Sequence, residues 1–189
     1  MIKHILLLSL AMLLFTTAVW TQEEAMTEKE KQKSERKKAE KAQRSSNYEA
    51  ILELLDERNF VIEAYQFVDR YGQTVQVNTT TNFIAVRDSV ATVQIVFPGS
   101  VSGYNGLGGI TLDGRLTSLE INEKDPGKGV RFQMRVFGSG FASADMFVDV
   151  GTDGRATIRY NGQYGSRFTL RGYFQSWAGS GVFKGSPLY

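Results

Sequence analysis

The sequence predicts a mainly β fold, either a twisted antiparallel meander sheet or a partly open barrel, with one N-terminal helix packed on it. Three observations favour this class. From Phe60 onward apolar and polar residues alternate with a period of two, the spacing of the two faces of a strand. Short turn sequences such as Asp-Gly and Asn-Gly separate the alternating stretches. The 189 residues include 19 Gly, 12 Phe and 8 Tyr, a composition typical of strands joined by tight turns.

Residues 1–21 have the pattern of a secretory signal peptide. Lys3 and His4 precede an apolar run from Ile5 to Val19, which is too short to span a bilayer as a stop-transfer helix. We place the cleavage near Gln22 and expect an exported protein, periplasmic or associated with the outer surface. No cysteine follows, which excludes lipoprotein processing and leaves the domain without disulfides.

Residues 22–46 are predicted to form a charged spacer. Glu and Lys or Arg recur in it at helical spacing, as at Glu40 and Arg44, but no continuous apolar stripe accompanies them. We expect a solvated segment, helical or frayed. The alternative is a coiled coil or a contact with an anionic surface.

An amphipathic helix should follow the spacer. Ser46 and Glu49 form a capping-box pattern, which predicts that the helix begins there. Tyr48, Ile51 and Leu55 fall on one face of this helix. We therefore expect it to cover an apolar face of the sheet.

The β-rich domain is predicted to span residues 47–175, and residues 176–189 to form an irregular tail. The turns inside the domain are short, among them Asp113-Gly114 and Asn161-Gly162, and this implies antiparallel neighbours. The candidate strands are Phe60 to Val68, Thr74 to Val77, Phe83 to Arg87, Val90 to Phe97, Gly109 to Leu112, Leu116 to Asn122, Val130 to Phe137, Ser143 to Val150, Ala156 to Tyr160 and Arg167 to Phe174.

Four stretches recur in the same order in one family: Phe60 to Ala64, Asn82 to Val86, Val93 to Gly99, and Gly108 to Gly114. Together they resemble an uncharacterised secreted family of Bacteroides and related bacteria, the domain-of-unknown-function family 4251. The resemblance covers about Tyr48 to Tyr173. It implies a Gram-negative envelope as the compartment and carries no activity or catalytic residues to transfer.

Composition excludes several classes of function. The single histidine, His4, belongs to the predicted signal, so the mature protein would lack the His and Cys that triads and zinc, haem or iron–sulfur sites need. We expect no cofactor and no metal. From Asn47 to Tyr189 there are 13 basic and 14 acidic residues, which argues against a nucleic-acid partner. Several strands are too short for an integral membrane protein, whose strands need ~9 to 11 residues each.

Two loops partly imitate ligand-binding sequences. Gly99 to Gly109 is rich in glycine but lacks the Lys-Ser/Thr pair and the helix of a phosphate loop. Asp149 to Gly154 resembles a calcium loop, but its third ligand position is glycine and the closing glutamate is missing. We interpret the first as a packed surface loop and the second as a hairpin turn.

The most specific pattern is a ladder of arginines on three predicted strands. In each strand two arginines stand four residues apart and alternate with apolar residues, so they share one outward face. The candidate binding residues are Arg131, Arg135, Arg155, Arg159, Arg167 and Arg171. Asp145 and Asp149 should lie among them. The face is either a solvated surface with cross-strand ion pairs or a recognition surface for a sulfated or carboxylated glycan or for lipopolysaccharide phosphate.

Asp88-Ser89-Val90 resembles the tripeptide at which Bacteroides-type envelopes attach O-linked glycans, which makes Ser89 a candidate modification site. A simple hairpin turn is the favoured interpretation.

We therefore predict a non-catalytic binding or structural module of the envelope, with an anionic glycan or lipopolysaccharide as the possible partner. The alternative is a carboxylate-dependent hydrolase acting on envelope or dietary glycan. Its acid and base would come from five carboxylates, with no pair preferred. They are Glu63, Asp113, Glu120, Asp145 and Asp149.

Overall fold

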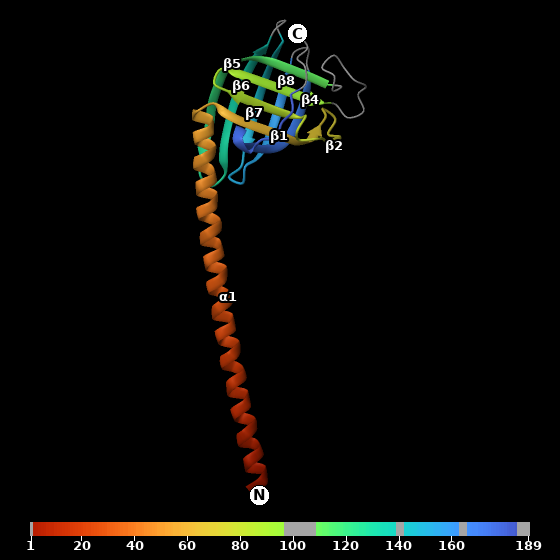
Figure 1. The fold of residues 1–189 in the computed structure, drawn as a ribbon. Helices are drawn as coiled ribbons and strands as arrows, with labels where there is room; N and C mark the ends of the chain where they lie inside the picture. The colour runs from red at the N-terminus through yellow and green to blue at the C-terminus, as the bar shows by residue number, and fades with distance from the viewer. Residues whose placement is uncertain (1, 97–108, 139–141, 163–165, 185–189) are drawn as a thin grey trace. The chain divides into compact units, whose positions relative to one another are not determined.

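The computed structural model describes residues 2–96, 109–138, 142–162 and 166–184, with side chains from Glu28 onward (Figure 1). The chain divides into two compact units, Met1–Gln43 and Arg44–Tyr189. The first unit is helical from Ile2, as part of α1 (Ile2–Asp56), and its described side chains are exposed. Among the described residues, no helix is both long and apolar enough to cross a membrane.

The predicted helix start at Ser46 is wrong, because α1 continues through this position. The preceding residues are mostly Glu, Lys, Arg, Gln and Ala, which favour helix, and neither Gly nor Pro interrupts them. Arg36 and Glu40 add an ion pair of 3.0 Å at i, i+4 spacing. A capping-box pattern marks the start of a helix only where the residues before it do not themselves favour helix.

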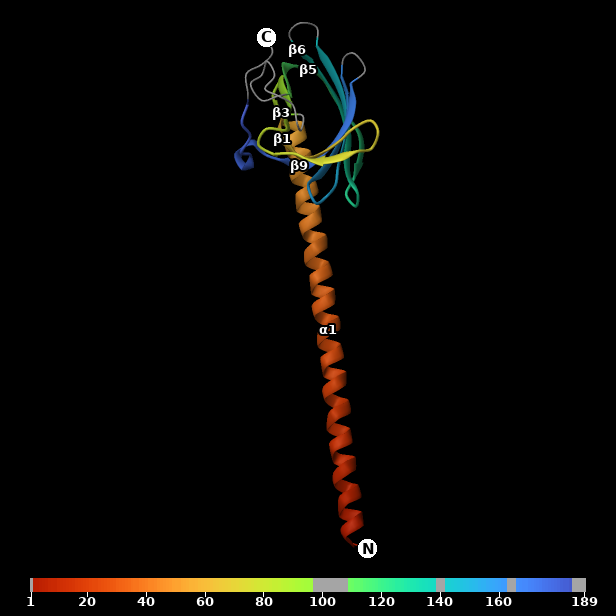
Figure 2. The same cartoon turned by 90° about the vertical axis from the view of Figure 1, so that its right-hand side faces the viewer.

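The second unit contains the end of α1 and an antiparallel sheet. Its strands are β1 (Asn59–Val68), β2 (Thr74–Gln76), β3 (Phe83–Arg87), β4 (Val90–Val96), β5 (Gly109–Asp125), β6 (Gly129–Gly138), β7 (Ser143–Val150), β8 (Arg155–Gly162) and β9 (Arg167–Gln175). Their order is β2-β1-β3-β4-β5-β6-β7-β8-β9, and β1 also pairs with β9. This last pairing closes the sheet into an eight-stranded barrel, with β2 as an additional strand beside β1 (Figure 2). The predicted antiparallel β fold with one N-terminal helix is confirmed.

Two predicted turns are misplaced, because strands extend into them. Asp113-Gly114 lies inside β5, which replaces two predicted strands, and Asn161-Gly162 lies at the end of β8. A Cβ on Gly114 would come within 2.5 Å of the Phe137 carbonyl oxygen, so glycine here permits close approach of β5 and β6 rather than a turn. A Cβ on Gly162 would lie 2.7 Å from the Tyr160 hydroxyl, so glycine leaves room for that ring.

The interior of the barrel is filled by aromatic and aliphatic side chains. The ring of Phe60 stacks on Phe174 at 4.9 Å between centroids and meets the edge of Phe132 at 5.9 Å. Closed barrels of eight strands have interiors narrow enough for side chains to fill, and this barrel follows that rule.

The end of α1 packs into this core, as the sequence predicted. Tyr48, Ile51 and Leu55 are buried in the same cluster as the barrel residues. The Asn47 side-chain amide donates to the Thr152 carbonyl oxygen at 3.2 Å, in the turn between β7 and β8. The helix therefore covers the barrel end at which β7 finishes and β8 begins.

The C-terminal segment, residues 176–184, crosses the outside of the barrel. It contains one short 3₁₀ helix, Trp177–Gly179. Trp177 and Val182 cover a second apolar cluster on β1 and β3, formed by Val61, Phe83 and Ala85. The Trp177 indole donates to the Val86 carbonyl oxygen at 2.8 Å. The packing of Trp177 and Val182 on this cluster explains why β1 and β3 carry apolar residues on their outer face as well as on their inner face.

Buried polar groups hold the same segment in place. Gln94, fully buried on β4, donates through Nε2 to the Phe183 carbonyl oxygen at 2.9 Å and to the Thr81 carbonyl oxygen at 3.0 Å. The Ser180 hydroxyl donates to Glu63 at 2.7 Å, and Lys184 pairs with Asp113 at 2.8 Å. The segment is thus an ordered part of the domain.

Truncation of Leu55 should expose the end of the core. We expect Leu55→Ala to lower the free energy of unfolding by about 2–5 kcal/mol, since the side chain is only 1% exposed. Urea denaturation measures the change. The control is Glu53→Ala on the exposed side of the same helix, where about 0.5 kcal/mol or less is expected. Equal effects of the two substitutions would show that the helix does not cover the core.

Loss of Trp177 should uncover the second apolar cluster. We expect Trp177→Ala to cost about 2–3 kcal/mol, below the value for a fully buried ring because this ring is half-buried. Phe183→Ala is the matched control, an aromatic ring of the same segment that is 62% exposed, and it should change stability by less than about 0.5 kcal/mol. Thermal unfolding of both variants decides the point, and an unchanged Tm for Trp177→Ala contradicts the packing described.

Candidate functional site

The six predicted arginines lie on one outer surface of the barrel, which we call the arginine face. The alternation of β6, β8 and β9 turns their apolar residues into the core and these side chains outward, where all six are exposed. They are Arg131 and Arg135 on β6, Arg155 and Arg159 on β8, and Arg167 and Arg171 on β9. Strand β7 lies between β6 and β8 and adds Asp145 and Asp149 to the same face. The sequence-based expectation of a shared face therefore agrees with the strand register.

On β6 both arginines are bound to carboxylates. Arg131 pairs with Glu123 of β5 at 2.7 Å and also with Asp149 of β7. Arg135 pairs with Asp145, to which its guanidinium donates two hydrogen bonds. Hydrogen bonds and charge from these carboxylates raise the pKa of Arg131 and the pKa of Arg135 above their usual value. Both side chains are therefore positively charged at any ordinary pH. Some of their N–H donors already bind carboxylates of the protein and are not available to a ligand.

The arginines of β8 and β9 are less engaged. Arg159 reaches the second oxygen of Asp149 at 3.2 Å, and Arg155 lies 3.6 Å from Asp153 in the preceding turn. Arg171 donates to the neutral side chain of Gln66 at 2.9 Å. Arg167 forms no ion pair within the described part of the chain. The arginines that carboxylates neutralise least thus lie on β8 and β9.

The sequence reasoning missed the acidic residues that β5 contributes. It placed only two aspartates among the arginines. In the structure Glu123 also binds Arg131, and Glu120 accepts a hydrogen bond from Gln133 at 2.7 Å. The signal was present, because β5 and β6 are consecutive and antiparallel. Bulges between Leu116 and Ser118 and between Ile121 and Glu123 shift the register, so simple alternation could not assign these side chains to a face.

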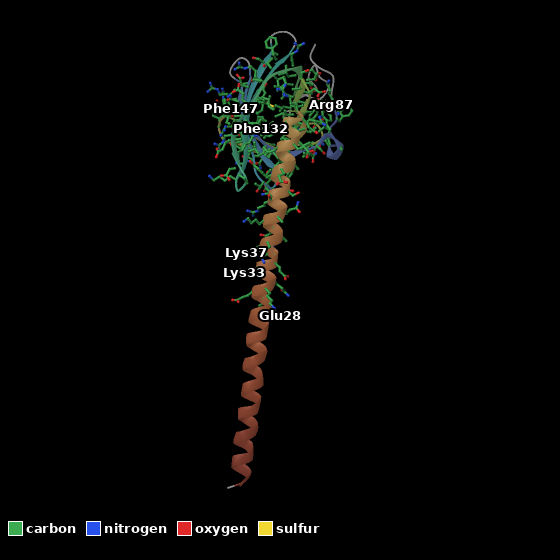
Figure 3. The ribbon with its side chains drawn as sticks, turned by 90° about the vertical axis from the view of Figure 1, so that its left-hand side faces the viewer. Glu28, Lys33, Lys37, Arg87, Phe132 and Phe147 are labelled. Carbon is green, nitrogen blue, oxygen red and sulfur yellow. The ribbon has the colours of Figure 1, made fainter. Side chains whose placement is uncertain are left out.

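A shallow groove of about 310 Å³ lies on the arginine face between β5 and β8. Its lining includes Gln133, Arg135, Asp145, Asn161 and Phe147. Phe147 is 39% exposed at an outward position of β7, and Figure 3 labels it together with Phe132, which is buried. An exposed ring among hydrogen-bonding groups suits the apolar face of a sugar. Phe147 stands between Asp145 and Asp149 in the sequence, and its alternation with buried residues of β7 could have placed it on this face.

The remaining predicted sites are accounted for as follows. Ser89 is exposed in the two-residue turn between β3 and β4, where Arg87 pairs with Val90 and Asp88 has φ 55°. Its glycosylation stays a prediction. Gly99 to Gly108 lie outside the described residues. Gly151 to Gly154 form the turn between β7 and β8, closed by a hydrogen bond of 2.9 Å from the Gly154 N–H to the Gly151 carbonyl oxygen.

The five carboxylates of the hydrolase alternative are distributed over two surfaces. Glu63 and Asp113 bind the C-terminal segment. Asp145 and Asp149 are held by arginines of the arginine face. Glu120 and Asp145 line the shallow groove on this face, where Glu120 accepts a hydrogen bond from Gln133 and Asp145 pairs with Arg135. Acid–base catalysis needs two carboxyl groups at one reacting bond, so this is the pair that the hydrolase alternative would use.

Together, fold and site define a closed antiparallel barrel whose outer wall carries an array of guanidinium groups.

The family model described as "Domain of unknown function (DUF4251)" matches residues 42–174. The crystal structure of a DUF4251 family protein from Bacteroides eggerthii DSM 20697 is similar, with 30% sequence identity and a TM-score of 0.63. The match covers 76% of this chain and 96% of that one. No curated protein matches. The chain belongs to the DUF4251 family, for which the resemblance seen in the sequence is confirmed.

Removal of Asp149 should free Arg159 from its ion pair and leave Arg131 paired with Glu123 alone. Because the pairs are exposed, we expect Asp149→Asn to change the free energy of unfolding by less than about 1 kcal/mol. The variant should elute from a heparin column at higher salt than the wild-type protein. Asp88→Asn is the control, since it removes the same charge in a turn where asparagine tolerates the positive φ. Equal shifts for both variants would mean that only net charge matters.

Proposed function

We propose that this protein is an exported, non-catalytic binding module of the bacterial envelope, and that the arginine face binds an anionic glycan. The observation that supports the proposal is the placement of six exposed arginines on the outer surface of neighbouring strands. A guanidinium group matches sulfate, carboxylate and phosphate groups in bidentate fashion. Export rests on the N-terminal pattern of Lys3, His4 and the apolar run after them.

The spacing of the arginines suits an extended polymer. Two arginines on one strand stand about 13 Å apart, given a rise of ~3.3 Å per residue. Strands β8 and β9 are adjacent, about 4.8 Å apart, whereas β6 and β8 are separated by β7 and so stand about 10 Å apart. A glycan with charged groups on successive sugars meets several of these positions at once, and this multiplies weak individual contacts.

The ion pairs already on the face do not oppose such binding strongly. Exposed pairs of this kind contribute about 0–1 kcal/mol each, so an arriving anion competes against a weak interaction. Because attraction between exposed charges is screened, binding should weaken steeply with salt. The ring of Phe147 adds an apolar contact that salt does not weaken.

Retention on immobilised heparin tests this function. We expect the quadruple variant Arg155→Gln, Arg159→Gln, Arg167→Gln and Arg171→Gln to lose most of the retention of the wild-type protein. The matched control removes four positive charges elsewhere: Arg36→Gln, Lys37→Gln, Arg44→Gln and Arg115→Gln, all exposed and outside the face. The control should retain most of the binding.

Replacement of the same four arginines by lysine separates charge from geometry. The lysine variant keeps the charge but loses the planar fork, so we expect retention between that of the wild-type protein and the glutamine variant. Indistinguishable elution of the wild-type protein and the quadruple glutamine variant would refute the proposal.

A further inference from the structure

We propose that a pocket at one end of the arginine face, which we call the rim pocket, binds the phosphate or sulfate monoester of a sugar. The inference rests on the proposed function and names one site and one ligand chemistry within it. The rim pocket has a volume of about 550 Å³. Its polar lining comprises Asp69, Arg70, Arg159, Asn161, Arg167 and Thr169.

The strand register explains why these side chains meet. Asn161 near the end of β8 pairs with Arg167 at the start of β9, and Arg159 pairs with Thr169. Thr169 in turn pairs with Val68, the last residue of β1, so Asp69 and Arg70 follow directly beside it. Three guanidinium groups from three separate segments therefore surround one pocket.

The loop that carries Arg70 is held in place by its own hydrogen bonds. The Asp69 carboxylate accepts the N–H groups of Tyr71 and Gln73, both at 2.8 Å. The Asp69 N–H donates to the Gln73 carbonyl oxygen at 2.9 Å, which closes the loop. Gly72 supplies the positive φ of 86° that the turn requires. The one carboxylate of the pocket is thus engaged in shaping the loop.

Arg70 contacts the side chain of its neighbour Tyr71, which is 74% exposed. Its guanidinium donates to the Tyr71 hydroxyl at 2.7 Å, and its Cζ lies 4.7 Å from the centre of the same ring.

The charge balance of the pocket favours an anionic group. Three guanidinium groups face one carboxylate, and that carboxylate already accepts two backbone hydrogen bonds. Of the three, Arg159 shares Asp149 with Arg131, and Arg167 forms no ion pair within the described residues. The pocket is therefore the least neutralised part of the arginine face.

The number of donors distinguishes a monoester from a carboxylate. A carboxylate offers two oxygens and is matched by one guanidinium fork, whereas a phosphate or sulfate monoester offers three terminal oxygens to several forks. The Asn161 amide and the Thr169 hydroxyl provide neutral groups for sugar hydroxyls. The volume lies within the usual range of ~300–1,000 Å³ for small-molecule sites and holds one sugar ring.

Calorimetric titration of the full protein tests the inference. The probes are glucose 6-phosphate, glucose 6-sulfate, glucuronate and glucose. We expect the phosphate ester, the sulfate ester or both to bind, glucuronate to bind at least tenfold more weakly, and glucose not to bind. The two ester probes identify which monoester the pocket prefers.

Variants locate the site. Arg70→Gln and Arg167→Gln should each weaken ester binding roughly tenfold or more, as expected for loss of a charge-assisted contact. Arg36→Gln and Arg115→Gln, both exposed and outside the arginine face, should leave ester binding unchanged within about twofold. All four side chains are exposed, and circular dichroism melting checks that each variant folds.

The outcomes separate this inference from the proposed function. Absence of ester binding, equal affinity for glucuronate, or an equal effect of all four variants would overturn the rim pocket as a monoester site. The proposed function would still stand if heparin retention were lost in the quadruple glutamine variant described above. Loss of both signals would overturn both.

Discussion

The antiparallel pairing of β1 with β9 is the constraint on which the rest of the structure depends. It joins the first strand of the meander to the last, so neither leaves a row of unpaired backbone groups as an open edge. A register shift between Ala64 and Gln66 bends β1, so that it pairs with β9 on both sides of the bulge, from Val61 to Val68. The closure encloses the stacked rings of Phe60 and Phe174.

Most of the fold could be predicted from alternation and turn residues. The strands β3 and β7 have the predicted limits, and most others differ by one or two residues at an end. The errors at Asp113-Gly114 and Asn161-Gly162 share one physical cause. A glycine that permits a close contact within a barrel has the same local sequence as a glycine that permits a turn. Closure itself was beyond local reasoning, because it depends on residues more than 100 positions apart.

The candidate site could be predicted only as far as alternation reaches. Period two placed Arg131, Arg155 and Arg167 on one side because each of their strands is regular around them. It could not reveal that Glu123 neutralises Arg131, since the bulges of β5 decide that contact. Nor could it join Arg70 to Arg167, because a loop after β1 meets the start of β9 only through closure of the barrel. Sequence patterns define faces, whereas pockets arise where distant strands meet.

Closure also gives the two ends of the barrel different chemistry. At one end Asn47 and Leu55 of α1 cover the core beside the turn between β7 and β8. Toward the other end Tyr160 stacks on Phe168, with 4.3 Å between the ring centroids. Burial raises the pKa of Tyr160, which keeps its phenol uncharged within this packing. A ligand in the rim pocket therefore meets guanidinium groups on the wall of the barrel. Recognition at such a wall depends on where the charges stand, and the pairing of β8, β9 and β1 sets their positions.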